Sequence, residues 1–334
     1  MHPYTHISKT HIHRKQESIH DRLFPRLRLF PAKTLFCAFE RSRDPPTNKT
    51  MECDMSLTDA APDSVEEDSM AEYSMMLQTV QASIFRILIE AMKEILPDTN
   101  VEFNSTGMRI ITMDSSHTVL VHLRLDGSQF EQFHCTKKIV VGINMQNLFK
   151  LVKTMSNNET LMLYILKNDQ SRLGIRIENG DKNTVTTFKL NLLDLDEEEL
   201  DVPPARFKSV INIPSTDFQK ICRDMNNLSQ LIEIKSAGSN LIFSCSGDFA
   251  NQETIMGESM SNGIRYQEKA DETDIIQGVF SLKHLTMFTK CTNLCNSIQM
   301  FLQNDYPLII AYQVGSLGEI KFVLAPKKVN VSHE

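Results

Sequence analysis

The sequence predicts an α+β protein of two similar domains, each with two helices and antiparallel sheets. Amphipathic helical segments recur at intervals of roughly sixty residues, short alternating strands fill the intervals, and the whole order occurs twice along the chain. The chain has 334 residues, which is long enough for two domains with separate hydrophobic cores.

The helices of the first copy are expected at 83–96 and 144–155. In "SIFRILIEAMKEIL" the apolar residues stand three and four positions apart, so they line one face of a helix, and "NMQNLFKLVKTM" has the same spacing. The second copy repeats the order with "STDFQKICRDMNNL" at 215–228 and "SLKHLTMFTKC" at 281–291.

Strands are expected between these helices. "MRIITMD" and "HTVLVHLRL" alternate in the first copy, and "LIEIKS" and "LIFSCSG" do so in the second. Because successive side chains of a strand point to opposite faces, Val119, Val121, Leu123 and Leu125 share one face.

A segment at 192–204, "LLDLDEEELDVPP", joins the two copies. It mixes leucines with carboxylates and ends on two prolines, which argues against a long helix. An ordinary solvated linker has no use for so many apolar side chains. The segment therefore either lies on a domain surface or offers its leucines to a partner.

These features divide the chain into four parts. Residues 1–69 have five histidines by position 20 but no sustained period, and they are expected to be a mostly disordered extension or sequence ahead of a true start at Met70. The first domain is expected at 70–190, the connector at 191–207, and the second domain with a C-terminal tail at 208–334.

The composition excludes several classes of protein. No apolar run is long enough to span a membrane and no secretory signal is present, so an intracellular protein is expected. The seven cysteines form no C-x-x-C pair, which favours reduced core thiols over disulfides or zinc. No G-x-S-x-G, Walker or H-E-x-x-H motif occurs, so no catalytic residue, metal or cofactor is predicted, and an enzyme is the weaker alternative.

Basic residues concentrate in the predicted helices, although the formal net charge of the chain is −7. The second helix of each copy has lysines and no acid, and the first helix of each copy has two basic residues offset by nearby acids. One such helix is usually only a solvated face, but recurrence in both copies favours a shared basic surface. The residues are Arg86, Lys93, Lys150, Lys153, Lys220, Arg223, Lys283 and Lys290.

Four separate segments resemble the proliferating cell nuclear antigen family, the eukaryotic sliding clamps, over about residues 70 to 328. They are "MDSSHTVLVHLRL" (113–125), "LDLDEEELDVP" (193–203), "CRDM" (222–225) and "LAPKK" (324–328). The resemblance implies the DNA-clamp fold, in which subunits close head to tail into a ring with pseudo-sixfold symmetry and with helices lining the hole. The subunits would pair through edge strands at 183–190 and 252–260.

The resemblance also implies a function. A homotrimer would encircle duplex DNA without reading its sequence, act as processivity factor for DNA polymerase, and serve as a platform for replication and repair proteins. It would be opened by a clamp loader, in the nucleus or in the replication compartment of a DNA virus. A clamp-like subunit of a heterotrimeric checkpoint ring, or a viral processivity factor that forms no ring, is the alternative.

Two sets of site residues follow from the resemblance. The eight basic residues of the helices would contact DNA. Partners with a glutamine, an aliphatic residue and two aromatics would bind a pocket between the domains and the connector. Its residues would be Met113, His117, Leu120, Leu200, Val202, Pro203, Pro307, Leu324, Ala325 and Pro326.

Overall fold

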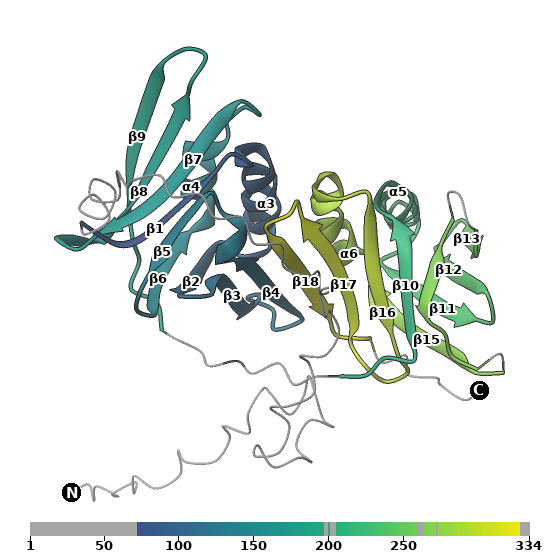
Figure 1. Ribbon diagram of the computed structural model, residues 1–334. Coiled ribbons are helices and arrows are strands. Elements are labelled where there is room, and N and C mark those ends of the chain that lie inside the picture. The colour runs from purple at the N-terminus through teal and green to yellow at the C-terminus, as the bar shows by residue number, and fades with distance from the viewer. Residues whose placement is uncertain (1–71, 197–199, 201–204, 260–262, 272, 328–334) are drawn as a thin grey trace, which may run out of the picture. The chain divides into compact units, whose positions relative to one another are not determined.

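The computed structural model describes residues 72–196, 200, 205–259, 263–271 and 273–327. All of these belong to one compact unit. The extension predicted at 1–69 lies outside the described residues, so it remains a prediction. Figure 1 shows the described part as helices and strands in two successive groups.

The first group of elements alternates short strands with two helices. In chain order they are β1 (Tyr73–Thr79), α3 (Ala82–Ile95), β2 (Asp98–Asn104), β3 (Gly107–Met113), β4 (Val119–Asp126), the 3-10 turn η2 (Gly127–Gln129), β5 (Gln132–Cys135), β6 (Ile139–Asn144), α4 (Met145–Val152), β7 (Glu159–Leu166), β8 (Asp169–Asn179) and β9 (Thr184–Asn191).

The second group repeats that order. Its elements are β10 (Ser209–Pro214), α5 (Ser215–Asn226), β11 (Leu231–Ala237), β12 (Asn240–Ser246), β13 (Asn251–Gly257), β14 (Arg265–Glu268), β15 (Ile275–Ser281), α6 (Leu282–Phe288), the 3-10 helix η3 (Thr289–Leu294), β16 (Ser297–Leu302), β17 (Leu308–Val314) and β18 (Gly318–Leu324).

Strand pairing is also repeated, which confirms the predicted two-copy fold. The first strand of each group pairs with two later ones, β1 with β5 and β7, and β10 with β14 and β16. In the same way β6-β2-β3-β4 matches β15-β11-β12-β13, and β7-β8-β9 matches β16-β17-β18. Every one of these pairs is antiparallel. The two groups are therefore two copies of one topological unit.

One strand pair joins strands from both groups in a sheet of nine strands, in the order β14-β10-β16-β17-β18-β4-β3-β2-β6. Strand β18 of the second group lies antiparallel to β4 of the first, with seven residues in register from Gly318 opposite Leu125 to Leu324 opposite Val119. The face of β4 predicted to be apolar, Val119 to Leu125, is buried. This pairing makes the contact between the groups a continuous backbone ladder.

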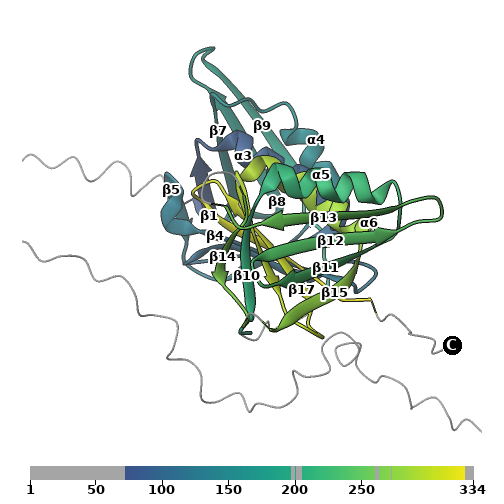
Figure 2. The ribbon, with the colours of Figure 1, turned by 90° about the vertical axis from the view of Figure 1, so that its right-hand side faces the viewer.

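The four helices lie in a row along one side of this sheet, in the spatial order α4, α3, α6, α5 (Figures 1 and 2). Contacts between α3 and α4, between α5 and α6, and between α3 and α6 hold the row together. Helix α3 buries Leu88, Met92 and Ile95 of the face that the apolar spacing predicts. Ile84 and Ile87 of that face are only half-buried, and Phe85 and Ile89 beside it are buried instead.

The fourth helix is shorter than predicted. The segment expected at 281–291 is α-helical only from Leu282 to Phe288 and then tightens into η3. The hydroxyl of Thr289 donates to the carbonyl oxygen of Thr286 at 2.8 Å, and that of Thr292 donates to Thr289 at 2.6 Å. Such bonds, together with β-branching, weaken the α-helical pattern, which periodicity alone does not reveal.

The described residues contain neither a membrane-spanning helix nor a candidate metal site. None of their helices is long and apolar enough to cross a membrane, and no group of three metal-ligating side chains occurs among them. Their five cysteines are free thiols, of which all but Cys295 are buried, as expected for core thiols. Burial raises the pKa of the Cys222 and Cys291 thiols well above the ordinary value, so both stay protonated.

Candidate functional site

Most residues of the predicted peptide pocket lie together where β3 and β18 end and β4 begins. Met113 lies opposite Leu120, and Val119 lies opposite Leu324. The backbone N–H of Ala325 donates to the carbonyl oxygen of Thr118 at 3.1 Å, which fixes the chain after β18 beside the β3–β4 turn. Pro307 immediately precedes β17, whose first residue is paired with Leu324. Residues from both groups are thus neighbours.

Exposure divides the predicted pocket residues into two layers. Leu120, Leu324 and Pro307 are buried, so they would be the floor of the predicted pocket. Five others are half-buried and keep exposed surface that a partner can cover, namely Met113, His117, Leu200, Ala325 and Pro326. Val202 and Pro203 lie outside the described residues, so their part in the pocket remains a prediction.

A buried carboxylate shapes the turn that carries His117. The side chain of Asp114 accepts hydrogen bonds from the backbone N–H groups of Thr118 and Val119, both at 2.8 Å, and from the hydroxyl of Ser116. His117 adopts a φ of 50°, a left-handed conformation that few non-glycine residues take. The bonds to Asp114 hold this turn closed. Sequence reasoning missed Asp114, because nothing in "MDSSH" distinguishes a structural carboxylate from a solvated one.

The pKa of Asp114 reflects two opposing effects. Burial raises it, but the hydrogen bonds from Ser116, Val119 and Thr118 stabilise the charged form and bring the pKa below the ordinary value of 3.8. A lowered native pKa means that the carboxylate contributes stability above the ordinary value and loses it as the pH falls through the native value.

Replacing Asp114 by alanine should lower the free energy of unfolding at pH 7 by about 1–3 kcal/mol, because the buried N–H of Val119 loses its acceptor and the turn loses its charge. Urea unfolding monitors this change. The difference from the native chain should shrink as the pH drops below the ordinary carboxyl pKa of 3.8 and through the lower pKa of the native Asp114. Asp248→Ala, in an exposed turn, is the matched control, and a destabilisation independent of pH would contradict the role of the charge.

The connector begins by lying on the first group. The backbone N–H of Leu193 donates to the carbonyl oxygen of Gly142 at 2.8 Å, and the side-chain amide of Asn100 donates to the carbonyl oxygen of Asp196 at 3.0 Å. A Cβ at position 142 would meet the Leu193 oxygen at 2.5 Å, so this approach requires glycine. The first of the two alternatives for this segment therefore holds for its opening residues.

The predicted DNA-contacting residues differ in exposure. Six of the eight side chains are exposed, namely Lys150, Lys153, Lys220, Arg223, Lys283 and Lys290. Of these six, Arg223 has a loose ion pair, with Asp224 at 3.6 Å. The other two are half-buried and paired: Arg86 lies 3.8 Å from Glu90, and Lys93 lies 3.3 Å from Glu94 and 4.0 Å from the ring centroid of Phe149. These two are the least available for an external phosphate.

Both predicted pairing strands lie at sheet edges. Strand β9 is the last strand of the five-stranded sheet β5-β1-β7-β8-β9, and β13 is the first of the four-stranded sheet β13-β12-β11-β15. Each has a large exposed apolar side chain, Val185 on β9 (54% exposed) and Ile255 on β13 (57% exposed). An edge strand with unpaired backbone groups and exposed apolar residues is a site for pairing with another strand.

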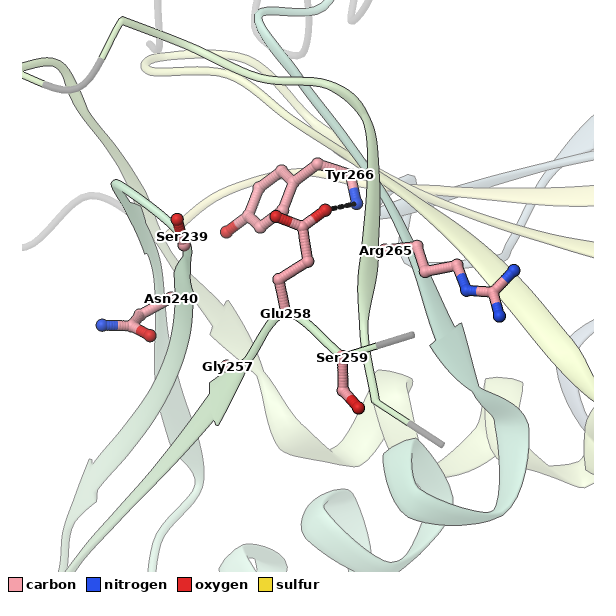
Figure 3. Close-up of a pocket in the computed structure, with 7 residues that line it drawn as sticks. All are labelled: Ser239, Asn240, Gly257, Glu258, Ser259, Arg265 and Tyr266. Carbon is pink, nitrogen blue, oxygen red and sulfur yellow. Dashed lines mark hydrogen bonds between the residues drawn. The ribbon is translucent and has the colours of Figure 1, made fainter. Parts of the chain in front are cut away.

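A polar hollow of about 800 Å³ adjoins the end of β13. Figure 3 shows Glu258 turned toward Tyr266, whose backbone N–H donates to Glu258 at 3.3 Å, while the Arg265 side chain points away from the hollow. Ser239 and Asn240 line the opposite wall. The hollow has one carboxylate and no pair of groups suited to acid–base chemistry among its described residues, so its position beside an edge strand is its most informative property.

Two family models match the chain almost end to end over the described residues. The N-terminal domain of proliferating cell nuclear antigen matches residues 75–199, and the C-terminal domain matches residues 201–327. The chain therefore belongs to the proliferating cell nuclear antigen family.

A viral relative supports the same assignment. The "Probable DNA polymerase sliding clamp 1" of Paramecium bursaria Chlorella virus 1 is 35% identical over 254 residues, which cover 75% of this chain and 95% of that protein.

Proposed function

We propose that the chain is a DNA sliding clamp: a ring that encircles duplex DNA, acts as the processivity factor of a DNA polymerase, and provides a docking surface for other replication and repair proteins. The observation that carries the proposal is the pair of edge strands β9 and β13. Their counterparts in the repeated topology are β18 and β4, which pair with each other inside the chain. Family membership and the name of the viral relative agree with it.

The repeated topology gives each free edge a counterpart. Strand β9 follows β8 as β18 follows β17, and β13 follows β12 as β4 follows β3. Inside the chain β18 pairs with β4. The same interaction by the other two strands needs a second copy, because β9 and β13 end different sheets. Head-to-tail pairing of this kind generates a closed ring or an open filament, and a pseudo-sixfold closure takes three two-domain chains.

The internal ladder also predicts the register between copies. Thr184 of β9 corresponds to Gly318 of β18, because each is the first residue of its strand to pair with the strand before it. Gly257 of β13 corresponds to Asp126 of β4, because each is the last residue of its strand to pair with the strand before it. Since Glu319 lies opposite Arg124, Val185 of one copy should lie opposite Ile255 of the next. The two most exposed apolar side chains of these edges would then cover each other.

The hollow beside Glu258 fits the same register. Inside the chain the N–H of Asp126 donates to the carbonyl oxygen of Leu317, in the turn before β18. The corresponding donor is Gly257, which lines the hollow, and the corresponding turn is 180–183 of the next copy. That turn includes Lys182, a suitable partner for the Glu258 carboxylate.

The row of helices would face the DNA. Lysine and arginine side chains that neutralise backbone phosphates bind without reading bases, and a topological ring then slides rather than dissociates. A polymerase held on the ring stays at a high effective concentration near the template. No chemistry of the chain itself is needed, and we propose that it is not an enzyme.

Reversing the charge of Lys150 and Lys290 together, to glutamate, should weaken retention of the ring on DNA at moderate salt. The salt dependence of binding should flatten by roughly one unit of slope for each phosphate that is no longer neutralised. Retention on linear DNA blocked at both ends, measured at several salt concentrations, tests this. Lys137→Glu, an exposed lysine outside the helices, is the control. Unchanged retention in the double variant would place the DNA elsewhere.

Partners and assembly complete the proposal. A clamp loader would open the ring, and proteins with a glutamine, an aliphatic residue and two aromatics would bind where β3 and β18 end and β4 begins. We propose a homotrimer that acts where DNA is replicated, in a nucleus or a viral replication compartment. The solution mass of the chain alone distinguishes a homotrimer from a heterotrimeric ring or a factor that forms no ring, since only a homotrimer has three copies of the chain without another protein.

A further inference from the structure

A second hollow, of about 870 Å³, includes Lys327, the residue that follows Pro326 of the predicted peptide pocket. We name it the lysine hollow after Lys283 and Lys327. Its wall consists of the turn after α5 (226–231), the β12–β13 turn (246–248), Ser281, Lys283 and Lys327. None of the other basic residues predicted to contact DNA lines it.

The chemistry of this wall suits an anion. The ammonium groups of Lys283 and Lys327 have no ion-pair partner among the described residues, and both residues are exposed. The side chains of Asn226, Asn227, Gln230 and Ser281 add amide and hydroxyl donors, and the exposed Asp248 is the one acid of the described wall. A carboxylate accepts hydrogen bonds through both oxygens and needs such donors.

Two observations place Lys283 and Lys327 in the same region, around β15 and the start of α6. The backbone N–H of Lys327 donates to the carbonyl oxygen of Val279 at 2.8 Å, which holds the chain after β18 against the strand that leads into α6. Burial lowers the pKa of His284, the carboxylate of Asp114 raises it, and both lysines lower it further. His284 therefore lies within range of both lysines and of Asp114, the carboxylate that shapes the turn of the peptide pocket.

The lysine hollow is continuous with the peptide pocket along the chain. Lys327 directly follows Ala325 and Pro326, which belong to the predicted pocket. Each residue of an extended peptide advances about 3.3 Å, so a segment seated in the pocket reaches the hollow within roughly three residues of its motif.

We propose that the lysine hollow is a subsite for an acidic flank, that is, for aspartate or glutamate residues next to the docking motif of a partner protein. This inference rests on the proposed peptide pocket and adds a specificity to it. A flexible peptide side chain enters a hollow, whereas the convex backbone of a duplex meets projecting side chains. Partners would therefore be acidic where they reach this hollow, whereas the acidic residues of the connector would favour basic flanks.

The test compares peptides that share the glutamine-aliphatic-diaromatic motif and have a three-residue flank of glutamate, glutamine or lysine. Each flank is placed once before the motif and once after it, which gives six peptides. Isothermal titration against the full chain should find the glutamate flank bound more tightly than the glutamine flank at one end only. In Lys283→Gln/Lys327→Gln the advantage should fall by roughly three- to ten-fold in Kd, the effect of two exposed ion pairs. Asp248→Asn should strengthen binding of the glutamate flank.

Lys137→Gln/Lys167→Gln, at two exposed lysines outside the helices and outside the hollow, changes the net charge equally and is the matched control, which should keep the glutamate advantage in full. Equal affinity for glutamate and glutamine flanks, or an advantage that survives in the Lys283/Lys327 variant, overturns the subsite while the peptide pocket stands. Weaker DNA retention in that variant with an intact glutamate advantage would assign the lysines to DNA instead. Failure of every peptide to bind the native chain refutes the pocket itself.

Discussion

Replacing Ile255 by glutamate is expected to convert the ring to monomers and to abolish stimulation of the polymerase. In the register inferred from β18 and β4, Ile255 covers Val185 of the next copy, and the substitution removes this apolar packing and leaves a carboxylate against a valine. The missing burial and the unpaired charge together should cost about 3 kcal/mol or more per junction, so the dissociation constant should rise at least about 100-fold. Light scattering across a concentration series measures it.

Ile275→Glu is a closely matched control. Ile275 is 52% exposed and lies on β15, the opposite edge of the same four-stranded sheet. A similar decrease of mass in both variants would mean that general destabilisation, rather than a junction at β13, explains the result.

A compensating change tests the register itself. Val185→Lys combined with Ile255→Glu places opposite charges across the predicted junction, and the double variant should recover part of the ring that is absent in either single variant. Placing the lysine at Thr187, two residues along β9, should recover less. Equal recovery from both positions would refute the predicted register but not the pairing of β9 with β13.

Shortening the half-buried wall of the peptide pocket is expected to have the second largest effect. Met113→Ala and Leu200→Ala together should weaken binding of a motif peptide by about 2 kcal/mol, or roughly thirty-fold, because each side chain still has exposed surface for a partner aromatic to cover. Isothermal titration measures the affinity, and light scattering should show an intact ring.

Leu193→Ala is the control for this pair of changes. Leu193 belongs to the same connector, but its backbone is tied to Gly142 and its side chain is 38% exposed outside the predicted pocket. Unaltered peptide affinity in the Met113/Leu200 variant would mean that the partner binds a different face.

Some features of this protein followed from its sequence alone. Apolar spacing predicted all four helices and the alternating strands, because these periods reflect local backbone geometry. The repeated order predicted two copies of one unit, and the cysteines were expected to be reduced core thiols, as Cys222 is. The length of α6 was wrong, because the threonine hydroxyls of η3 bond to backbone carbonyls in a way that hydrophobic periodicity does not register.

Other features depend on interactions between residues far apart in the chain, and only the tertiary structure decided them. No local pattern states that β18 pairs with β4, since the ladder joins residues about 200 positions apart and its register is set by the packing of both groups. That pairing brings Ala325 beside Thr118, assigns the free edges to β9 and β13, and turns Val185 and Ile255 from two isolated apolar residues into opposite positions of one predicted junction. The lysine hollow has the same origin: Lys283 and Lys327 lie far apart in the chain and line one hollow, and the backbone N–H of Lys327 is bonded to Val279. Sequence periodicity determines the elements and their buried faces, whereas the long-range ladder determines which surfaces remain for partners.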